Sequence, residues 1–310
     1  MCGLFGFLNY SNKDIKGLPD LTNALAEHSA VRGTDATGIS FVSGGTIRIV
    51  KEAKAARNVD FKHPDNLKAL TGHTRHSTQG SEKRNYNNHP FFGRCKNARF
   101  SLAHNGVLYN DDELKKKYKL PRTKIETDSY IAVQLIEKRN KVDFDSIRFM
   151  AEKVEGSFSF SILDDRNNLY LVKGDSPLSI LHFPELKLYV YASTDEILYK
   201  ALVDSPLFSE LKRGEDEEIK ISEGEILKIR CDGIVTKENF EYSHYHGRNW
   251  WEFGSFCDFG SGYTRSSYIE DLKSIACYQG YSPDDIDKML ERGFTLDEIE
   301  EYIYCMDGEV

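Results

Sequence analysis

The second residue of the chain is a cysteine, which follows the initiator methionine directly and precedes Gly3. Cysteine is small enough for Met1 to be removed, and removal would leave a thiol and a free α-amine on one residue. A thiol is a suitable nucleophile for covalent acyl transfer, and an α-amine with a pKa of about 7.7–8.0 can act as its base near neutral pH. A cysteine in a short N-terminal strand is also an ordinary small buried residue. Cys2 is therefore a candidate nucleophile whose role depends on the rest of the chain.

Four polar clusters lie at or near the ends of apolar segments that we expect to be strands or helices. Such positions are where a rigid scaffold presents functional groups. The clusters are residues 32–38 (Arg-Gly-Thr-Asp-Ala-Thr-Gly), residues 72–80 (Gly-His-Thr-Arg-His-Ser-Thr-Gln-Gly), residues 87–91 with 102–106, and residues 127–129 (Thr-Asp-Ser).

These clusters contain a set of groups suited to hydrolysing the side-chain amide of an amino acid. Attack by Cys2 on an amide creates an oxyanion, for which the Asn105 side chain and the Gly106 backbone N–H are candidate donors at a predicted tight turn. Arg75 suits a substrate carboxylate and Asp128 suits a substrate ammonium. Each residue alone also has an ordinary explanation, as a surface charge, a helix cap or a hairpin turn.

Taken together, these stretches resemble the class II, N-terminal-nucleophile glutamine amidotransferases, and in particular the glutaminase domain of glucosamine-6-phosphate synthase. The resemblance covers about residues 2–230. The matching stretches keep the order of the family: Met1-Cys2-Gly3, Arg32-Gly33-x-Asp35-x-x-Gly38, Gly72-His73-Thr74-Arg75, Asn88-His89-Pro90, His104-Asn105-Gly106 and Asp128.

The resemblance implies a role for each matching residue. It makes Cys2 the nucleophile with its α-amine as general base, Asn105 and Gly106 the oxyanion hole, and Arg75, helped by Thr78, the carboxylate site. Asp128 would hold the substrate amino group. The resemblance also implies that Arg32 and Asp35 organise the loop around the nucleophile.

The chain departs from the synthase at two positions of the Arg75 motif. His76 stands where the synthase has Trp, and Gln79 stands where it has His. We count His76 among the substrate-binding residues. Both departures bear on the lid over bound glutamine and on its coupling to a second active site.

The order of the elements predicts an α+β fold, because strands occur in blocks interrupted by a pair of helices. The resemblance implies a four-layer αββα sandwich, to which we add a small C-terminal helical appendage. We expect strands at 4–8, 38–42, 46–50, 70–75, 99–104, 158–163, 169–172, 179–183, 188–192, 218–221 and 225–229, and helices at 18–30, 127–138, 144–154 and 195–203.

We expect three regions along the chain. Residues 2–235 form the amidotransferase domain, and residues 236–265 form an aromatic and glycine-rich linker or arm that holds both tryptophans. Residues 266–310 form a small acidic helical unit, with one helix across 269–276 and further helix starts at Ser282-Pro283 and at Thr295.

Composition restricts the class of protein further. Of the net charge of −8, residues 266–310 hold 12 acidic and 3 basic side chains, which gives −9 there and leaves +1 for residues 1–265. This distribution argues against nucleic-acid binding, which needs clustered positive charge. The six cysteines include no C-x-x-C pair, so we expect no metal, no cofactor and no disulfide framework. The absence of a membrane-length apolar run or a basic leader favours the cytoplasm and no membrane partner.

The leading interpretation is a stand-alone glutamine amidotransferase. It would hydrolyse L-glutamine through a γ-glutamyl thioester on Cys2 and deliver ammonia to an acceptor or partner synthase in trans. Two alternatives stay open: an N-terminal-nucleophile amidohydrolase acting on another γ-glutamyl amide, and a weakly active glutamine-binding module that docks on a partner. The ammonia acceptor and the oligomeric state cannot be read from the sequence.

Overall fold

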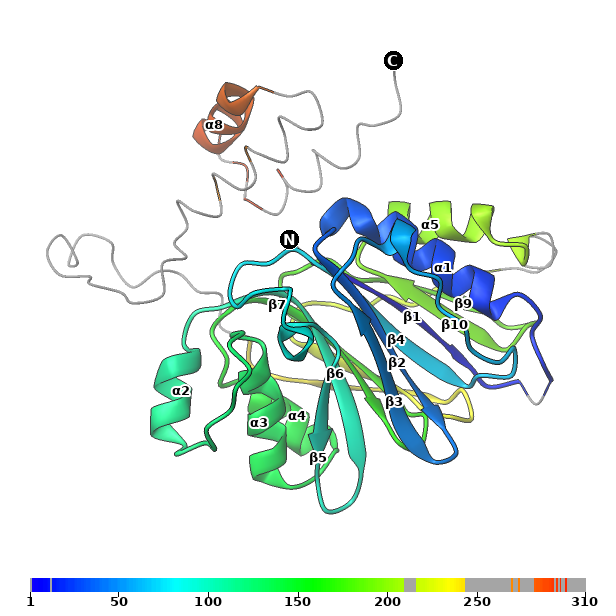
Figure 1. The fold of residues 1–310 in the computed structure, drawn as a ribbon, viewed down its shortest axis with the longest axis horizontal. Helices are drawn as coiled ribbons and strands as arrows, with labels where there is room; N and C mark the ends of the chain where they lie inside the picture. The colour runs from blue at the N-terminus through cyan, green and yellow to red at the C-terminus, as the bar shows by residue number, and fades with distance from the viewer. Residues whose placement is uncertain are drawn as a thin grey trace, which may run out of the picture. The chain divides into compact units, whose positions relative to one another are not determined.

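The computed structural model describes residues 2–11, 13–208, 216–242 and 282–292, together with residues 269, 273, 294, 296 and 299. The chain divides into two compact units, residues 1–245 and residues 246–310. In the first unit, Figure 1 shows two layers of strands with α1 and α5 on one side and α2, α3 and α4 on the other.

The first sheet has seven strands in the order β11-β9-β10-β1-β4-β2-β3, and its paired strands run antiparallel. Its central strand β1 begins directly after Cys2 and is hydrogen-bonded on both sides, to β10 and to β4. The strands are β1 Gly3–Asn9, β2 Ala36–Ser43, β3 Thr46–Glu52, β4 Ala69–Arg75, β9 Ser179–Phe183, β10 Leu188–Ala192 and β11 Glu217–Glu218.

The second sheet has six antiparallel strands in the order β13-β12-β8-β7-β6-β5. Strand β6, which carries the His104-Asn105-Gly106 stretch, lies next to the edge strand β5, between β5 and β7. The strands are β5 Phe91–Arg94, β6 Arg99–Leu108, β7 Gly156–Asp164, β8 Leu169–Lys173, β12 Glu225–Ile229 and β13 Val235–Asn239.

Side-chain alternation along β1 shows how the layers are held together. Leu4 and Leu8 join the apolar cluster between the two sheets, whereas Phe5 and Phe7 join the cluster beneath α1 and α5. Residues of a strand point to opposite faces in turn, so an all-apolar strand can bury both of its faces. The helices on this side are α1 Leu18–Ser29 and α5 Asp195–Asp204, with the short 3₁₀ helices η1 Ala30–Arg32 and η2 Ala56–Asn58.

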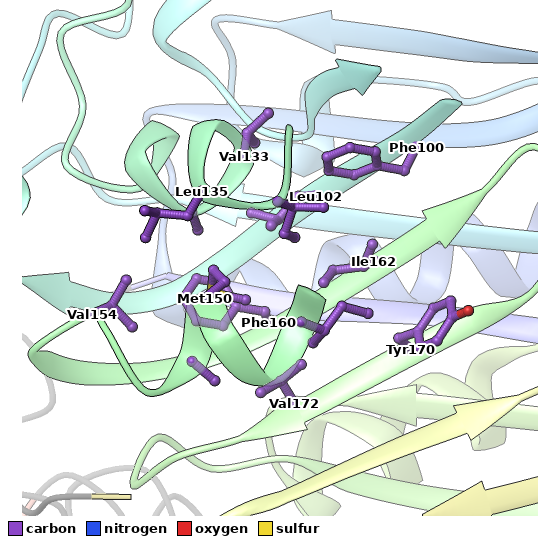
Figure 2. Close-up of a cluster of buried hydrophobic side chains, with 14 of the residues drawn as sticks. Phe100, Leu102, Val133, Leu135, Met150, Val154, Phe160, Ile162, Tyr170 and Val172 are labelled. Carbon is purple, nitrogen blue, oxygen red and sulfur yellow. The ribbon is translucent and has the colours of Figure 1, made fainter. Parts of the chain in front are cut away.

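The outer face of the second sheet is covered by α3 Tyr130–Arg139 and α4 Phe144–Ala151. Figure 2 shows this core, in which Val133 and Leu135 of α3 and Met150 of α4 lie over Leu102 of β6 and Phe160 of β7. The remaining elements of this side are the short helix α2 Asp111–Lys117 and the 3₁₀ helix η3 Asn85–Asn87.

The predicted four-layer α+β sandwich is confirmed, and the elements differ from the prediction in detail. The helix predicted from residue 127 begins at Tyr130, and the strand predicted at 218–221 is only the pair Glu217–Glu218. The short strands β5 and β13 were not predicted. β13 carries the second sheet past residue 235, the boundary expected for the domain.

In the second unit, the helix α8 Pro283–Glu291 follows its N-cap Ser282, at the helix start that the sequence predicts. Ser282 N–H donates to the Asp285 carboxylate at 3.1 Å, which is one half of a capping box. The helices predicted at 269–276 and from Thr295, and residues 243–265 of the expected arm, lie outside the continuous described ranges. Within those ranges, no helix combines the length and apolar character that crossing a bilayer requires.

Candidate active site

Strand pairing brings the start of the chain beside the end of β4. Cys2 precedes β1, and the antiparallel neighbour β4 ends at Arg75. The Cys2 thiol donates to the carbonyl oxygen of His76 at 3.6 Å, and Arg32 Nε donates to the carbonyl oxygen of Cys2 at 2.8 Å. The thiol and the backbone of Cys2 are therefore both held by residues of the predicted site.

The turn after η1 packs directly on the segment that follows β4. At Gly33, a Cβ would lie 2.4 Å from the carbonyl carbon of Arg75 and 2.5 Å from the nitrogen of His76, so no side chain fits. Asp35 N–H donates to Arg75 O at 2.9 Å, and Ser77 N–H donates to Asp35 Oδ2 at 2.7 Å. Asp35 thus holds the segment that positions Arg75.

Arg75 is buried and binds the loop around it. Its Nη1 donates to Asn88 Oδ1 at 2.7 Å, and its Nη2 donates to the carbonyl oxygens of Gln79 at 2.6 Å and Gly80 at 2.8 Å. A guanidinium has five N–H donors. These three bonds fix its orientation. Nε–H and the second N–H of Nη1 make no hydrogen bond to the described residues and are candidate donors for a substrate carboxylate.

Asp128 is buried just before α3 and also receives hydrogen bonds from the protein. Leu108 N–H donates to its Oδ2 at 2.7 Å and the Ser129 hydroxyl to its Oδ1 at 3.3 Å, while Asp128 N–H donates to Gln79 Oε1 at 2.9 Å. Burial raises the pKa of Asp128 to about 6, and the bonds from Leu108 and Ser129 oppose that rise. The carboxylate is thus ionised at neutral pH and able to pair with an ammonium.

The Cys2 thiol, Arg75 and Asp128 are close enough to affect one another's ionisation. Burial raises the pKa of the Cys2 thiol above its usual value; Arg75 lowers it and Asp128 raises it. The thiol therefore stays protonated at neutral pH. It becomes a nucleophile when a base takes its proton.

Asn105 and Gly106 lie inside β6, which corrects the expectation that they form a turn at the end of a strand. Asn105 pairs with Ser159 of β7, and β6 continues to Leu108. Gly106 has φ +131°, and a Cβ on it would lie 2.0 Å from the carbonyl oxygen of Ser157. Asn105 Nδ2 is buried and has no hydrogen-bond partner among the described residues, as expected of a donor that serves a ligand.

Three buried histidines pack beneath this site. The rings of His73 and His89 are 4.1 Å apart, those of His89 and His104 are 6.5 Å apart, and His73 Nε2 donates to His104 O at 2.9 Å. Burial lowers the pKa of His73 to about 3 and of His104 to about 4, so both are neutral at physiological pH. They form no metal site: in the described part of the chain, no group of three or more His, Cys, Asp or Glu side chains could hold an ion.

The structure adds contributors that the sequence did not identify. Gln79, noted only as a departure from the family motif, bonds to both Arg75 and Asp128. Asn88 lies in a matching stretch to which we assigned no role, and its side-chain oxygen accepts a hydrogen bond from Arg75. Thr78 lies half-buried in the segment after β4, between His76 and Gln79. The polar character of residues 76–80 was the available signal, and their contacts depend on the folded loop.

Several known proteins are similar to this chain. A family model described as a glutamine amidotransferase domain matches residues 73–200, which include Arg75, Asn105 and Asp128. A glutamine–fructose-6-phosphate aminotransferase (isomerizing) of Staphylococcus aureus (strain Mu50 / ATCC 700699) is 31% identical over 256 residues, covering 77% of this chain and 39% of the relative. The chain thus carries a glutamine amidotransferase domain and is similar to the class II glutamine amidotransferases.

A second relative and two solved structures are also similar to this chain. The aminotransferase of Staphylococcus epidermidis (strain ATCC 12228 / FDA PCI 1200) is 32% identical over 194 residues, covering 58% of this chain and 30% of the relative. The chain thus spans well under half the length of these curated relatives. Among solved structures, a glutamine phosphoribosylpyrophosphate amidotransferase from B. subtilis has a TM-score of 0.61 at 21% identity. The match covers 78% of this chain and 50% of the B. subtilis chain. An allosteric regulatory enzyme of purine biosynthesis has a TM-score of 0.63, also at 21% identity, with the same coverage. These two structures share the fold.

Proposed function

We propose that this chain hydrolyses L-glutamine to glutamate and ammonia through a γ-glutamyl thioester on Cys2. The observation that carries the proposal is a set of contacts: the Cys2 thiol bonds to the backbone of His76, next to Arg75, and Gln79 bonds to both Arg75 and Asp128. Free glutamine presents a carboxylate and an ammonium at one end and an amide at the other. A cation, an anion and a nucleophile in one site match those three groups.

The chemistry follows from the positions of the groups. The α-amine of Cys2 takes the thiol proton, and the sulfur forms a bond to the amide carbon. The oxyanion that results is held by Asn105 Nδ2 and the Gly106 N–H. The C–N bond then breaks, and the amine returns the proton to the departing nitrogen, which leaves as ammonia. Water attacks the thioester, releases glutamate and restores the thiol.

This mechanism requires the amine to be on Cys2 itself. Because burial raises the pKa of the thiol, few thiolates exist at neutral pH without a neighbouring base. Removal of Met1 creates that base on the same residue, with a pKa of about 7.7–8.0. We propose that activity appears only in the processed chain, and that the ammonia is passed in trans to an acceptor on a partner protein.

The test compares processed wild type with Cys2→Ala, and uses Cys231→Ala as the matched control because Cys231 is an exposed free thiol. We expect ammonia release from glutamine by wild type and Cys231→Ala and none by Cys2→Ala. Mass spectrometry of the rapidly quenched wild type should show one added glutamyl group on Cys2. If processed wild type releases no ammonia from glutamine but forms an acyl-enzyme with another γ-glutamyl amide, the substrate proposed here is wrong.

A further inference from the structure

A surface pocket of about 510 Å³ lies where the edge strands of the two sheets come together. It is lined by residues of β3 and β5, by the η3 turn, and by the segment that leads into α3. This volume falls within the range of about 300–1,000 Å³ that is usual for small-molecule sites. None of the residues to which we assign glutamine binding or catalysis lines it.

The walls of the pocket are aromatic and aliphatic. Tyr86, Phe91 and Tyr130 supply rings, with Phe91 and Tyr130 edge to face at 5.5 Å between centroids. Ile49 and Ile125 supply aliphatic surface. Such walls favour a flat apolar body, because aromatic rings stack on one another and release water from both surfaces.

Lys51 is the charged residue of this lining. Its Nζ donates to the carbonyl oxygen of Asn88 at 2.6 Å and lies 5.4 Å from the centroid of the Phe91 ring. Among the described residues it has no ion pair with a carboxylate, and the charge that acts on it is the positive charge of Arg75. Burial and Arg75 together lower the pKa of Lys51 to about 8. A half-buried ammonium with one of its three donors in use attracts an anion.

We propose that this pocket binds a small aromatic anion, an arene carboxylate or arene phosphate, whose ring lies among Tyr86, Phe91 and Tyr130 and whose anionic group pairs with Lys51. The aromatic walls select the ring and Lys51 selects the charge. The pocket thus recognises both features of one ligand and is distinct from the glutamine site.

The pocket is joined to Arg75 through one residue. Asn88 accepts from Lys51 with its backbone oxygen and from Arg75 with its side-chain oxygen. An anion that draws Lys51 away from Asn88 alters the support of Arg75, so the ligand and glutamine should change each other's affinity. This coupling rests on the proposed function, whereas binding of the aromatic anion does not.

Binding is tested on the full-length Cys2→Ala chain, which needs no turnover. The probes are benzoate, phenyl phosphate, the neutral benzyl alcohol and inorganic phosphate, measured by calorimetry and ligand-observed NMR. We expect at least one arene anion to bind about tenfold or more tightly than both benzyl alcohol and inorganic phosphate, since a hydrogen bond to a charged group contributes that much. The two arene anions distinguish a carboxylate ligand from a phosphate ligand. If neither binds, or if inorganic phosphate binds equally well, the proposal fails.

Variants locate the site. Lys51→Met should lower the affinity for the arene anion about tenfold or more, whereas Lys51→Arg should retain that affinity. Lys62→Met, at an exposed lysine paired with Asp60, should leave the affinity unchanged. Unchanged affinity in Lys51→Met would overturn the proposal. If Lys51→Met does not fold, reductive methylation of lysines in the full-length Cys2→Ala chain replaces it. The bound arene anion should protect Lys51 from methylation. Equal methylation of Lys51 with and without the anion would overturn the proposal. A chain that binds benzoate but releases no ammonia contradicts the glutaminase function and leaves the pocket intact.

Discussion

The side-chain oxygen of Gln79 accepts a hydrogen bond from the backbone N–H of Asp128 at 2.9 Å. The backbone oxygen of the same glutamine accepts from Arg75 at 2.6 Å. One residue therefore sets the spacing between the cation and the anion that we assign to the two charged groups of glutamine. Neither contact requires Gln79 to touch the substrate.

Gln79→Met should raise the KM for glutamine and leave kcat nearly unchanged. The methionine has a similar size but leaves the Asp128 N–H without its acceptor, at a cost of about 1–3 kcal/mol, or roughly 5- to 150-fold in affinity. Gln79→Glu keeps an oxygen acceptor and should retain most of the affinity at pH 8. Steady-state kinetics on both variants decide the matter; an unaltered KM in Gln79→Met contradicts this role.

Glutamine affinity should fall as the pH drops through about 6. The pKa of Asp128 is raised to about 6, so protonation below that pH removes the charge that pairs with the substrate ammonium. Calorimetry on Cys2→Ala should show constant affinity above pH 7 and a loss of about tenfold per pH unit well below the pKa. In Asp128→Asn the affinity should be weak at every pH. A wild-type pH profile in that variant would assign the titration to another group.

Asn105→Ala should lower kcat about 10²- to 10³-fold, the usual effect of removing one oxyanion donor. Asn105 Nδ2 bonds to no acceptor in the part of the chain that the structure describes, so its loss leaves no acceptor there unsatisfied and the unfolding free energy should change little. Asn97→Ala serves as a control for a structural asparagine, because Asn97 bonds to the backbone of Val142. This variant should lower the unfolding free energy and leave kcat unchanged. A similar kcat in Asn105→Ala and wild type would remove Asn105 from the mechanism.

Gly106→Ala should destabilise the protein and abolish turnover. The added Cβ would lie 2.0 Å from Ser157 O at a φ of +131° that alanine rarely adopts, so β6 must separate from β7. Gly44→Ala is the matched control, since Gly44 also has a positive φ but no described atom lies within 4 Å of where its Cβ would be, and the cost should be about 1–2 kcal/mol. Chemical unfolding of both variants tests the comparison. Equal destabilisation would show that backbone strain, and not the contact with Ser157, determines the cost.

The sequence predicted much of the fold because local patterns and burial agree there. Residues 4–8 are apolar on both faces, and the structure buries both faces of β1. At Asn105 and Gly106 the local pattern was misleading: a polar pair after an apolar run indicates the end of a strand. The unusual φ of Gly106 lets β6 continue against β7, and this outcome depends on a tertiary contact.

Gln79 and the strand β5 were missed because their roles also depend on tertiary contacts. Gln79 differs from the synthase motif, so the resemblance offered no role for it, and its contact with Asp128 spans 49 residues of sequence. The strand β5 has only four residues, too few for a clear alternating pattern. Both features are decided by what packs against them after the chain has folded.

The place of β1 at the middle of its sheet has a consequence for the reactive sulfur. Chain ends usually fray, and a nucleophile there would lose its alignment. Here β1 is hydrogen-bonded to β10 on one side and to β4 on the other, so the backbone next to Cys2 is held as firmly as that of an interior strand. The amide protons of Leu4 and Phe5 should consequently exchange with solvent as slowly as those of buried core strands, whereas amides near a chain end normally exchange fast.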